Sequence, residues 1–332
     1  MFRNNYSNQT KSRDDPHRGR PVAVIGELNP DLVASGLTSA PVLGHEILAE
    51  DFQTVLGSAS AIFACGMARL RHPVSFFSKV GDDELGRFCL KSLRSQGVST
   101  RHVRTLAKTR TGVTISLSTR SDRALVTMLG AISELRYSDL ELNALRGHSH
   151  LHLTSFFLQT ALRPAFPRIL RRARKLGLTT SFDPNSDPSS SWGSDLWRVI
   201  DETTILFLNR AEALQLTRRS TVRGALSQLA QRVPCVVIKL GPRGAIAAAG
   251  EQTVTVAGFA VSPVDTTGAG DSFAAGFVHA YLSGRTLRQC VVEGNACGAL
   301  STLEVGGTGG QPDLPQLTRF LDRHGRSTNL PG

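Results

Sequence analysis

The chain has 332 residues, of which 40% are hydrophobic and 20% charged. That length exceeds the usual size of a single core, yet one α/β domain with a small addition can use all of it. The composition excludes a wholly disordered, collagenous or disulfide-scaffold chain, and no run approaches the ~18 apolar residues of a membrane-spanning helix. The formal net charge of +11 is compatible with an anionic ligand, a nucleic acid, a membrane surface or only a solvated surface.

The five cysteines contain no C-x-x-C pair, so neither a zinc site nor a redox motif is indicated. Their apolar surroundings in the sequence predict buried free thiols. Residues 1–20 are polar, carry five Lys or Arg and lack an apolar h-region, so we expect a disordered basic tail rather than a secretory signal. We also expect a flexible C-terminus over 326–332. Together these features predict a cytoplasmic, reducing setting.

Strand and helix patterns alternate along most of the chain, starting with a buried strand that ends in Gly26. Strands are expected at 21–26, 73–80, 150–157, 178–182, 205–208, 235–240 and 245–249. Helices are expected at 59–70, 83–96, 164–176, 211–216, 222–232, 271–283 and 287–303. Such alternation predicts an α/β fold, a doubly wound and mainly parallel sheet with helices on both faces.

Two segments interrupt this alternation. Residues 111–129 alternate polar and apolar on both sides of a turn at Ser121-Asp122, which predicts an antiparallel hairpin. Residues 32–56 combine Gly and Pro breaks with short alternating stretches. We expect 33–56 and 109–130 to form a small β lid over the carboxyl edge of the sheet, inserted in a single domain of residues 21–325.

The most informative stretch is Val264-Asp-Thr-Thr-Gly-Ala-Gly-Asp-Ser-Phe-Ala-Ala-Gly276. Gly268, Ala269 and Gly270 would open a helix, and the uncovered N–H groups and the dipole of a helix start form an anion hole. Asp271 would stand beside the bound anion and accept a proton from an attacking hydroxyl. The alternative is that Asp271 only caps the helix, but a cap does not require the preceding Gly-Ala-Gly.

DTTGAGDSFAAGF resembles the carboxyl-terminal signature of the ribokinase-like carbohydrate kinase family, also called the PfkB family. Between about Pro21 and Leu317 the other markers of that family recur in its order: GELNPDL at 26–32, SKVGDDELG at 78–86, DPN at 183–185, N-x-x-E at 209–212, KLGPRG at 239–244 and GNACGAL at 294–300. The resemblance implies a ribokinase-like fold and a kinase that moves the γ-phosphoryl group of ATP onto a hydroxymethyl group. A hexose, a hexulose or a keto-deoxy sugar acid is the expected acceptor. A nucleoside kinase of the adenosine type and a non-catalytic ligand sensor remain alternatives.

The resemblance also implies roles for individual residues, with Asp271 as the base. The residues implied to contact the nucleotide are Asn185, Asn209, Lys239, Gly241, Gly244 and Asn295. Glu212 would hold Mg²⁺ through water, and Asp265 and Thr267 match a loop that holds a monovalent cation such as K⁺ in many members. Four of these residues have a plainer interpretation: Glu212 as an exposed first-turn glutamate, Gly241 and Gly244 as turn glycines, and Asn295 as a polar helix residue.

The acceptor side departs from the family pattern. Asp31 matches the family's acceptor-binding aspartate with Asn29 beside it, although Asn-Pro-Asp could be only a turn. Ribokinase-type members carry G-G-K-G-A-N, where this chain has Gly57-Ser-Ala-Ser-Ala-Ile62. Gly57 and Ser58 are therefore expected at the acceptor, but Ile62 cannot replace the hydrogen bonds of an Asn, so ribose is not favoured.

The remaining sequence patterns give weaker indications of function. His148, His150 and His152 alternate, and a solvated strand edge is favoured over a metal site. Arg120 and Arg123 flank the hairpin turn, where they either reach an acidic or phosphorylated acceptor or are only solvated. The basic helix at 168–175 lacks aromatic stacking partners, so we expect neither nucleic acid nor membrane as a partner. Lid strands often supply dimer contacts in the family, which makes a homodimer through the lid an open expectation.

Overall fold

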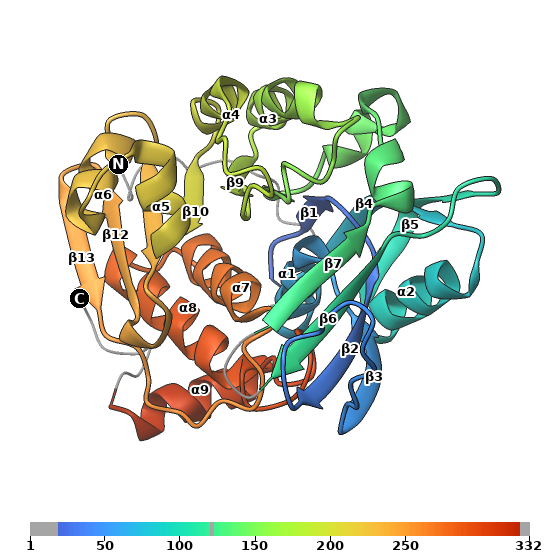
Figure 1. Ribbon diagram of the computed structural model, residues 1–332. Coiled ribbons are helices and arrows are strands. Elements are labelled where there is room, and N and C mark those ends of the chain that lie inside the picture. Colours follow the sequence, from blue (N-terminus) through green and yellow to red (C-terminus); the bar gives the residue numbers. More distant parts are fainter. Residues whose placement is uncertain (1–18, 120–122, 326–332) are drawn as a thin grey trace.

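The computed structural model describes residues 19–119 and 123–325, and within them the chain forms two sheets. In spatial order the strands of the larger, nine-stranded sheet are β13 (Gln252–Val256), β12 (Ala245–Ala249), β11 (Cys235–Lys239), β10 (Ile205–Asn209), β9 (Thr179–Asp183), β8 (His150–Thr154), β1 (Val22–Ile25), β4 (Val74–Gly81) and β5 (Val98–Leu106). Pairing is parallel from β5 to β11 and antiparallel from β11 to β13. The doubly wound, mainly parallel sheet predicted from the sequence is confirmed (Figure 1).

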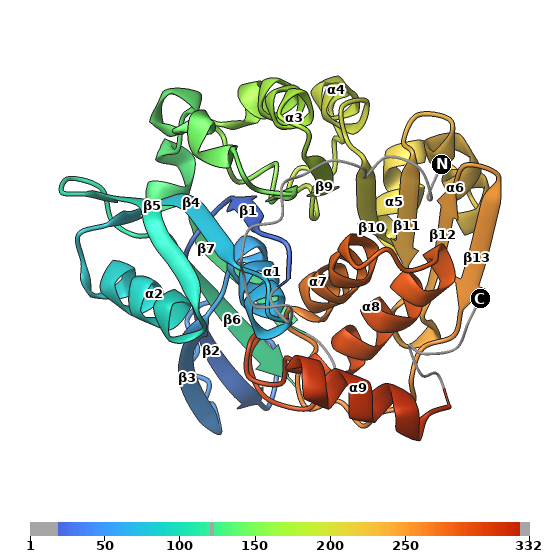
Figure 2. The same ribbon diagram turned by 180° about the vertical axis from the view of Figure 1, so that it is seen from behind.

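Helices cover both faces of this sheet. One face carries α1 (Ala59–Arg69), α2 (Glu84–Ser95), α7 (Ala269–Leu282) and α8 (Leu287–Ser301), and α9 (Leu314–Arg323) packs on α8. The other face carries α3 (Phe166–Lys175), α4 (Ser194–Ile200), α5 (Arg210–Thr217) and α6 (Val222–Ala230). Short 3₁₀ helices lie at Gly130–Glu134, Tyr137–Asp139, Leu142–Leu145, Arg163–Ala165 and Gly241–Arg243. Figure 2 shows α1, α7 and α8 side by side on their face of the sheet.

Strand β1 explains why the strands read as continuous apolar runs. Val22 and Val24 pack into the core cluster that includes α1, α7 and α8, while Ala23 and Ile25 pack into the cluster with α3 to α6. Successive side chains of a strand point to opposite faces, so a strand covered on both sides favours apolar residues at successive positions. All four are fully buried.

The segments expected to form a lid make the second sheet, ordered β3 (Asp51–Leu56), β2 (Pro30–Leu37), β6 (Val113–Thr119) and β7 (Arg123–Met128). We call these four strands the lid. One face of the lid, with Asp31, Val33, Thr114, Ser116 and Thr127, borders a cavity. The strand registers place Phe52, Ile115, Val126 and Met128 on the opposite face, where they are exposed.

The prediction of solvated histidines is wrong for His150 and His152. Both lie on β8, between β1 and β9 in the middle of the large sheet, and are buried. His150 is hydrogen-bonded through Nδ1 to Thr179 Oγ1 (2.8 Å) and through Nε2 to Ser181 Oγ (2.7 Å), and burial lowers its pKa to about 3. These neutral rings belong to the core. Nowhere in 19–119 or 123–325 do three or more His, Cys, Asp or Glu gather in a way that could hold a metal ion.

The remaining sequence predictions are partly confirmed, partly incomplete and partly outside the described residues. The cysteines are buried free thiols, as predicted. Strands β5 and β13 and helices α4 and α9 were not predicted. Arg120, the side chain of Arg123 and both predicted tails, except for Gly19 and Arg20, fall outside the described residues. In the part of the chain that is described, no helix has both the length and the apolar character needed to span a bilayer.

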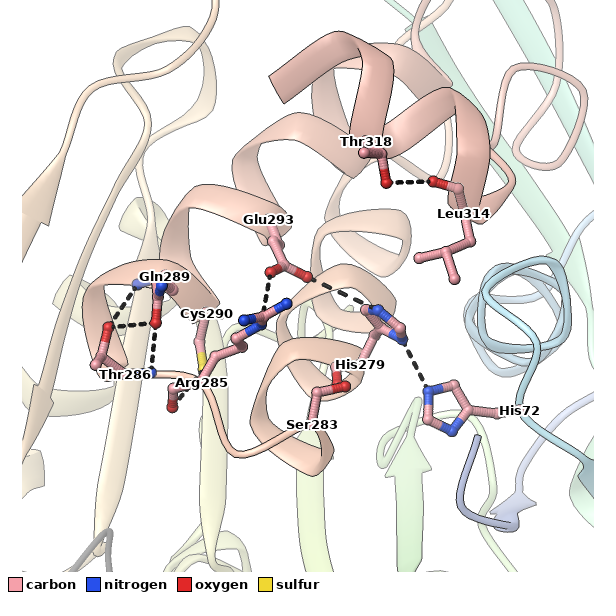
Figure 3. A network of polar contacts seen from close by, with 10 residues as sticks. All are labelled: His72, His279, Ser283, Arg285, Thr286, Gln289, Cys290, Glu293, Leu314 and Thr318. Carbon is pink, nitrogen blue, oxygen red and sulfur yellow. Dashed lines mark hydrogen bonds and ion pairs between the residues drawn. The ribbon is translucent and has the colours of Figure 1, made fainter. Parts of the chain in front are cut away.

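A buried polar network joins the end of α1 to α7 and α8 (Figure 3). His72 Nε2 lies 2.9 Å from His279 Nδ1, whose ring lies 3.9 Å from Glu293 Oε2, and Arg285 Nε lies 3.8 Å from Glu293 Oε1. Burial lowers the pKa of His279 to about 3 and raises that of Glu293 to about 7. The network fixes together the two helices that carry Asp271 and Asn295.

Candidate active site

A cavity of about 1370 Å³ opens where the carboxyl ends of the parallel strands meet the lid. This edge is where open α/β sheets usually bind ligands. The sequence-predicted residues that line it are Asn29, Asp31, Ser58, Asn185, Asn209, Glu212, Lys239, Gly241, Gly244, Thr267, Gly268, Ala269, Gly270, Asp271 and Asn295. Gly57 and Asp265 lie outside the lining, and Glu27, which was not predicted, belongs to it.

Helix α7 begins at Ala269, two residues earlier than expected, with Gly268 as its N-cap at φ 70°. No side chain caps this helix, so its N-terminus remains available to an anion. A Cβ on Gly268 would approach Gly307 Cα to 2.8 Å, and one on Gly270 would approach Lys239 Nζ to 3.1 Å. Gly268 is therefore required by space as well as by backbone conformation, and a side chain at Gly270 would crowd the end of Lys239.

Asp271 is the third residue of α7 and does not cap it, so the capping alternative is wrong. Burial raises the pKa of Asp271 well above its usual value, and the neighbouring carboxylates of Asp183, Glu27 and Glu212 raise it further, while Lys239 lowers it. A carboxylate with an increased affinity for protons suits a general base.

Lys239, at the end of β11, lies among carboxylates. Its Nζ is 2.5 Å from Asp183 Oδ2, and the two side chains are 14% and 2% exposed. Burial alone would lower the pKa of Lys239, but Asp183, Glu212 and Asp271 raise it above its usual value. The lysine therefore stays charged and partly balances the negative charge of the site.

Asn209 and Glu212 form a capping box at the start of α5. Glu212 N donates to Asn209 Oδ1 (2.9 Å), and Asn209 N donates to Glu212 Oε2 (2.7 Å). Glu212 is only 5% exposed, so the reading as an exposed first-turn glutamate is wrong. Burial, and then the charge of Asp183, raises the pKa of Glu212 to about 6.

At the far end of the cavity Gly241 and Gly244 have φ of 62° and 90°. A Cβ on Gly244 would lie 2.1 Å from Val256 O, so this turn approaches the end of β13 more closely than other residues allow. Asn295 on α8 donates through Nδ2 to Val256 O and Ala257 O, both at 3.3 Å. These contacts assemble the turn, β13 and α8 into one wall.

The predicted acceptor residues lie where the lid joins the large sheet. Asp31 belongs to β2, so the turn reading of Asn-Pro-Asp is wrong. Asn29 donates through Nδ2 to Asp31 Oδ1 and to Thr114 Oγ1, both at 3.3 Å. A Cβ on Gly57 would lie 1.9 Å from Asp31 Oδ1. Gly57 therefore gives the Asp31 carboxylate its room without lining the cavity itself.

Glu27 is the site residue that the sequence reasoning missed. Its Oε1 accepts from Ser155 Oγ (2.7 Å) and Ser60 N (3.2 Å), and its Oε2 accepts from Ser60 Oγ (2.5 Å). Burial raises the pKa of Glu27 and these hydrogen bonds lower it, with a net rise. The sequence feature that could have indicated Glu27 is its position, because it is a charged residue directly after the first buried strand and the glycine that ends it.

Two predicted residues belong to the surroundings of Glu27. Ser58, with φ 72°, donates through Oγ to Glu27 O (2.5 Å) and accepts from Ala61 N (3.3 Å), which caps α1. Asn185 donates through Nδ2 to Ser155 Oγ (2.9 Å). In this structure Asn185, assigned to the nucleotide from the sequence, is thus bound to the Glu27 side of the cavity. Ser155 and Asn185 both have positive φ, 53° and 57°.

Asp265 organises the loop before α7. Its Oδ1 accepts from Thr267 N (2.8 Å) and Thr267 Oγ1 (2.7 Å), and its Oδ2 accepts from Gly306 N (2.9 Å). Both carboxylate oxygens are thus used within the chain. The loop that the sequence reasoning linked to a monovalent cation is held in shape by this aspartate.

The profile of the pfkB family carbohydrate kinase matches residues 20–314. The chain belongs to this family. It is therefore a carbohydrate kinase, a phosphotransferase with an alcohol group as acceptor. The family resemblance stated from the DTTGAGDSFAAGF motif is confirmed.

Relatives of this kinase include an "uncharacterized sugar kinase" of Archaeoglobus fulgidus, 31% identical over 74% of this chain and 98% of that protein. A 2-dehydro-3-deoxygluconokinase of Bacillus subtilis is 32% identical over 83% of this chain and 89% of its own length. Among solved structures, a putative ribokinase II from E. coli in complex with ATP and Mg²⁺ superposes with a TM-score of 0.82 at 26% identity, covering 92% of this chain and 100% of that one. The ribokinase-like fold is thereby confirmed.

Proposed function

We propose that this kinase transfers the γ-phosphoryl group of ATP to a hydroxymethyl group of a small sugar or sugar acid, with a hexose, hexulose or keto-deoxy sugar acid as the acceptor. The observation that carries the proposal is the meeting of Asp271, the uncapped start of α7 and Asp31 in one cavity. Relatives named for sugar kinases support the acceptor class.

In this mechanism the acceptor lies against Asp31 and Asn29, where carboxylate and amide groups can pair with its hydroxyls. Asp271 takes the proton of the reacting hydroxyl of the acceptor. The oxygen of that hydroxyl bonds to the γ-phosphorus, and the bond between the γ-phosphorus and the oxygen that joins it to the β-phosphate breaks. The N–H groups at the start of α7 meet the negative charge of the phosphoryl oxygens, and one such donor typically contributes about 10²–10³ in rate.

The nucleotide is expected along Asn209, Lys239, Gly241, Gly244 and Asn295. Lys239 offers a cation close to the anion hole, as the Gly270 geometry shows. The turn with Gly241 and Gly244 and the Asn295 wall line the same cavity, which suits the more remote part of ATP.

The residues also fit Mg²⁺ bound with ATP. Glu212 is a buried carboxylate beside Asp183, and their mutual repulsion favours a cation nearby. Magnesium prefers oxygen ligands and keeps much of its water, so Glu212 would hold it through water; the ion supplies neutralisation of phosphate charge. For K⁺ we propose that Asp265 acts by shaping the loop that contains Thr267, since its own oxygens are occupied.

We propose two roles for the lid. Its cavity face carries Asp31 and Thr114, so closure over the acceptor would exclude water and limit ATP hydrolysis. Its outer face exposes Phe52, Ile115 and Val126. A sheet face of this kind fits the same face of a second copy, because pairing would remove apolar surface from water.

The test is an acceptor panel of sugars, sugar acids and nucleosides scored by ADP release. Asp271→Asn is expected to lower kcat by about 10²–10⁴ while the KM for ATP changes little. The Tm should not fall, because the substitution removes a buried carboxylate whose pKa is raised. Asp201→Asn, which changes a half-exposed carboxylate paired with Arg232, is the matched control and should keep full activity.

The results of the panel distinguish a sugar kinase from a nucleoside kinase and from a non-catalytic ligand sensor. If no acceptor stimulates ADP release, the kinase proposal fails, and tight sugar binding without turnover would favour the ligand sensor. Turnover of adenosine but of no sugar would favour the nucleoside kinase. Equal turnover by Asp271→Asn would remove the assigned base.

A further inference from the structure

Asp183 is a buried carboxylate that lies outside the lining of the cavity. It ends β9, and its side chain is 2% exposed. A charged carboxylate is rarely buried unless a partner compensates its charge. The partner of Asp183 is Lys239, which ends β11 and does line the cavity. Asp183 can therefore act on a ligand only through this lysine.

The ion pair between Asp183 and Lys239 reaches across a strand. In the large sheet β10 lies between β9 and β11, and its last residue, Asn209, is paired in register with Lys239. The lysine side chain must cross the end of β10 to bring Nζ within 2.5 Å of Asp183 Oδ2. Because a lysine side chain is flexible, a contact of this kind is what fixes the position of its ammonium group.

The ammonium group lies beside the start of α7. A Cβ on Gly270 would be 3.1 Å from Lys239 Nζ and 3.7 Å from Lys239 Cε, and the next residue of the helix is Asp271. The N-terminus of α7 has no side-chain cap. A phosphoryl group bound there would meet the N–H groups of the helix start and the ammonium group together.

Three carboxylates surround this single ammonium group. Against the effect of burial, Asp183, Glu212 and Asp271 all raise the pKa of Lys239. Burial raises the pKa of Asp271, and Lys239 is the largest influence that lowers it. In the described part of the chain Lys239 nevertheless forms its ion pair with Asp183 and with neither of the other two. An ammonium group paired with Asp271 would occupy the carboxylate that has to accept the proton of the acceptor.

We propose that Asp183 is a positioning residue of this kinase: it holds the Lys239 ammonium group beside the start of α7, where that group meets the transferred phosphoryl group, and keeps it from pairing with Asp271. The inference rests on the proposed function and deepens it. It adds a residue that touches neither substrate, and it gives Lys239 a part in the transfer step in addition to nucleotide binding.

The experiment is a double-variant cycle on kcat, with the sugar that the acceptor panel shows to be turned over fastest. Lys239→Met is expected to lower kcat by about 10²–10³, as the loss of one donor to the phosphoryl charge does. Asp183→Asn keeps the shape of the side chain and should lower kcat by about tenfold or more, because the ammonium group is present but no longer held. The KM for the sugar should change by less than about threefold, since Asp183 does not touch the acceptor.

The double variant separates positioning from a structural role. Adding Asp183→Asn to Lys239→Met should lower kcat no further, since no ammonium group remains to be positioned. Denaturant titration of the same proteins gives the second measurement. The double variant should regain stability relative to Lys239→Met, because no buried carboxylate is left without its cation, and it should not regain kcat. A merely structural pair would regain both together.

The ion pair between Lys79 Nζ and Asp139 Oδ2 (2.7 Å) is the matched control. Its side chains are 9% and 16% exposed, and both residues lie outside the cavity lining. Asp139→Asn should lower stability and leave kcat unchanged. An unchanged kcat in Asp183→Asn, or the same loss with and without Lys239, overturns the inference while the kinase activity stands. Failure of every acceptor overturns the proposed function and this inference with it.

Discussion

Replacing Glu212 with Gln should stabilise the protein at neutral pH. The carboxylate is 5% exposed, and burial together with Asp183 raises its pKa to about 6 from 4.5. A Gln can keep the capping box, because its side-chain oxygen can still accept from Asn209 N. The substitution therefore removes a charge and leaves the local structure of α5 in place.

The magnitude follows from the pKa. A rise from 4.5 to about 6 corresponds to about 2 kcal/mol, since a tenfold change in proton affinity equals ~1.4 kcal/mol. The folded state binds this proton more tightly than the unfolded chain, so the free energy of unfolding falls as pH rises through 4.5 to 6. Above pH ~7 the cost is complete, and below pH ~4 it vanishes because Glu212 is neutral in both states.

Thermal unfolding of the ligand-free protein at pH 4.5 and pH 8 measures this cost. For a chain of this size about 2 kcal/mol corresponds to a few °C in Tm. Glu212→Gln should gain up to that amount at pH 8 and little at pH 4.5, whereas Glu251→Gln, an exposed glutamate between β12 and β13, should gain nothing at either pH. The same gain at both pH values would refute the reasoning. The stabilised variant should also need more Mg²⁺ for turnover.

Two further predictions concern buried charge and the lid. Lys239→Met should lower the free energy of unfolding by about 3–5 kcal/mol, because it leaves the buried Asp183 without its cation. Denaturant titration measures this loss, and adding Asp183→Asn should largely restore the stability. A double variant no more stable than Lys239→Met would contradict the prediction. Val126→Glu should yield monomers in sedimentation velocity, since Val126 is 57% exposed on the outer lid face beside Ile115. A monomeric wild type would refute the lid dimer.

The parallel core was readable from the sequence because its strands are covered on both faces. Runs such as Val22–Ile25 and Cys235–Lys239 are apolar at nearly every position, which is what such a location demands. Strand β5, Val98–Leu106, lies at the edge of the sheet and its burial is intermittent. Its polar residues concealed it, since an edge strand need not be apolar throughout.

The residues of the candidate site also divide into those that a local sequence pattern predicts and those that it does not. Gly268, Gly270 and Asp271 lie together in one motif, so the sequence alone places the anion hole beside a carboxylate. Glu27 meets Ser155, which is 128 residues away in the chain, and no local pattern predicts a contact at that separation. His152 shows the converse error, since period-two spacing gives the face of a strand but not whether that face is covered.

The polar network behind the site has a consequence for how the protein responds to acid. The folded state holds a proton on Glu293 below about pH 7, whereas the unfolded chain takes it up only near 4.5. His279 behaves in the opposite sense, because its pKa falls from 6.5 to about 3 on folding, and the pKa of His72 is lowered too. Between about pH 4.5 and 6.5 the proton that Glu293 gains on folding offsets the proton that His279 loses, while the lowered pKa of His72 adds to the loss. Within this polar network between α7 and α8, the loss of stability that the histidines cause on acidification is thus partly compensated by Glu293.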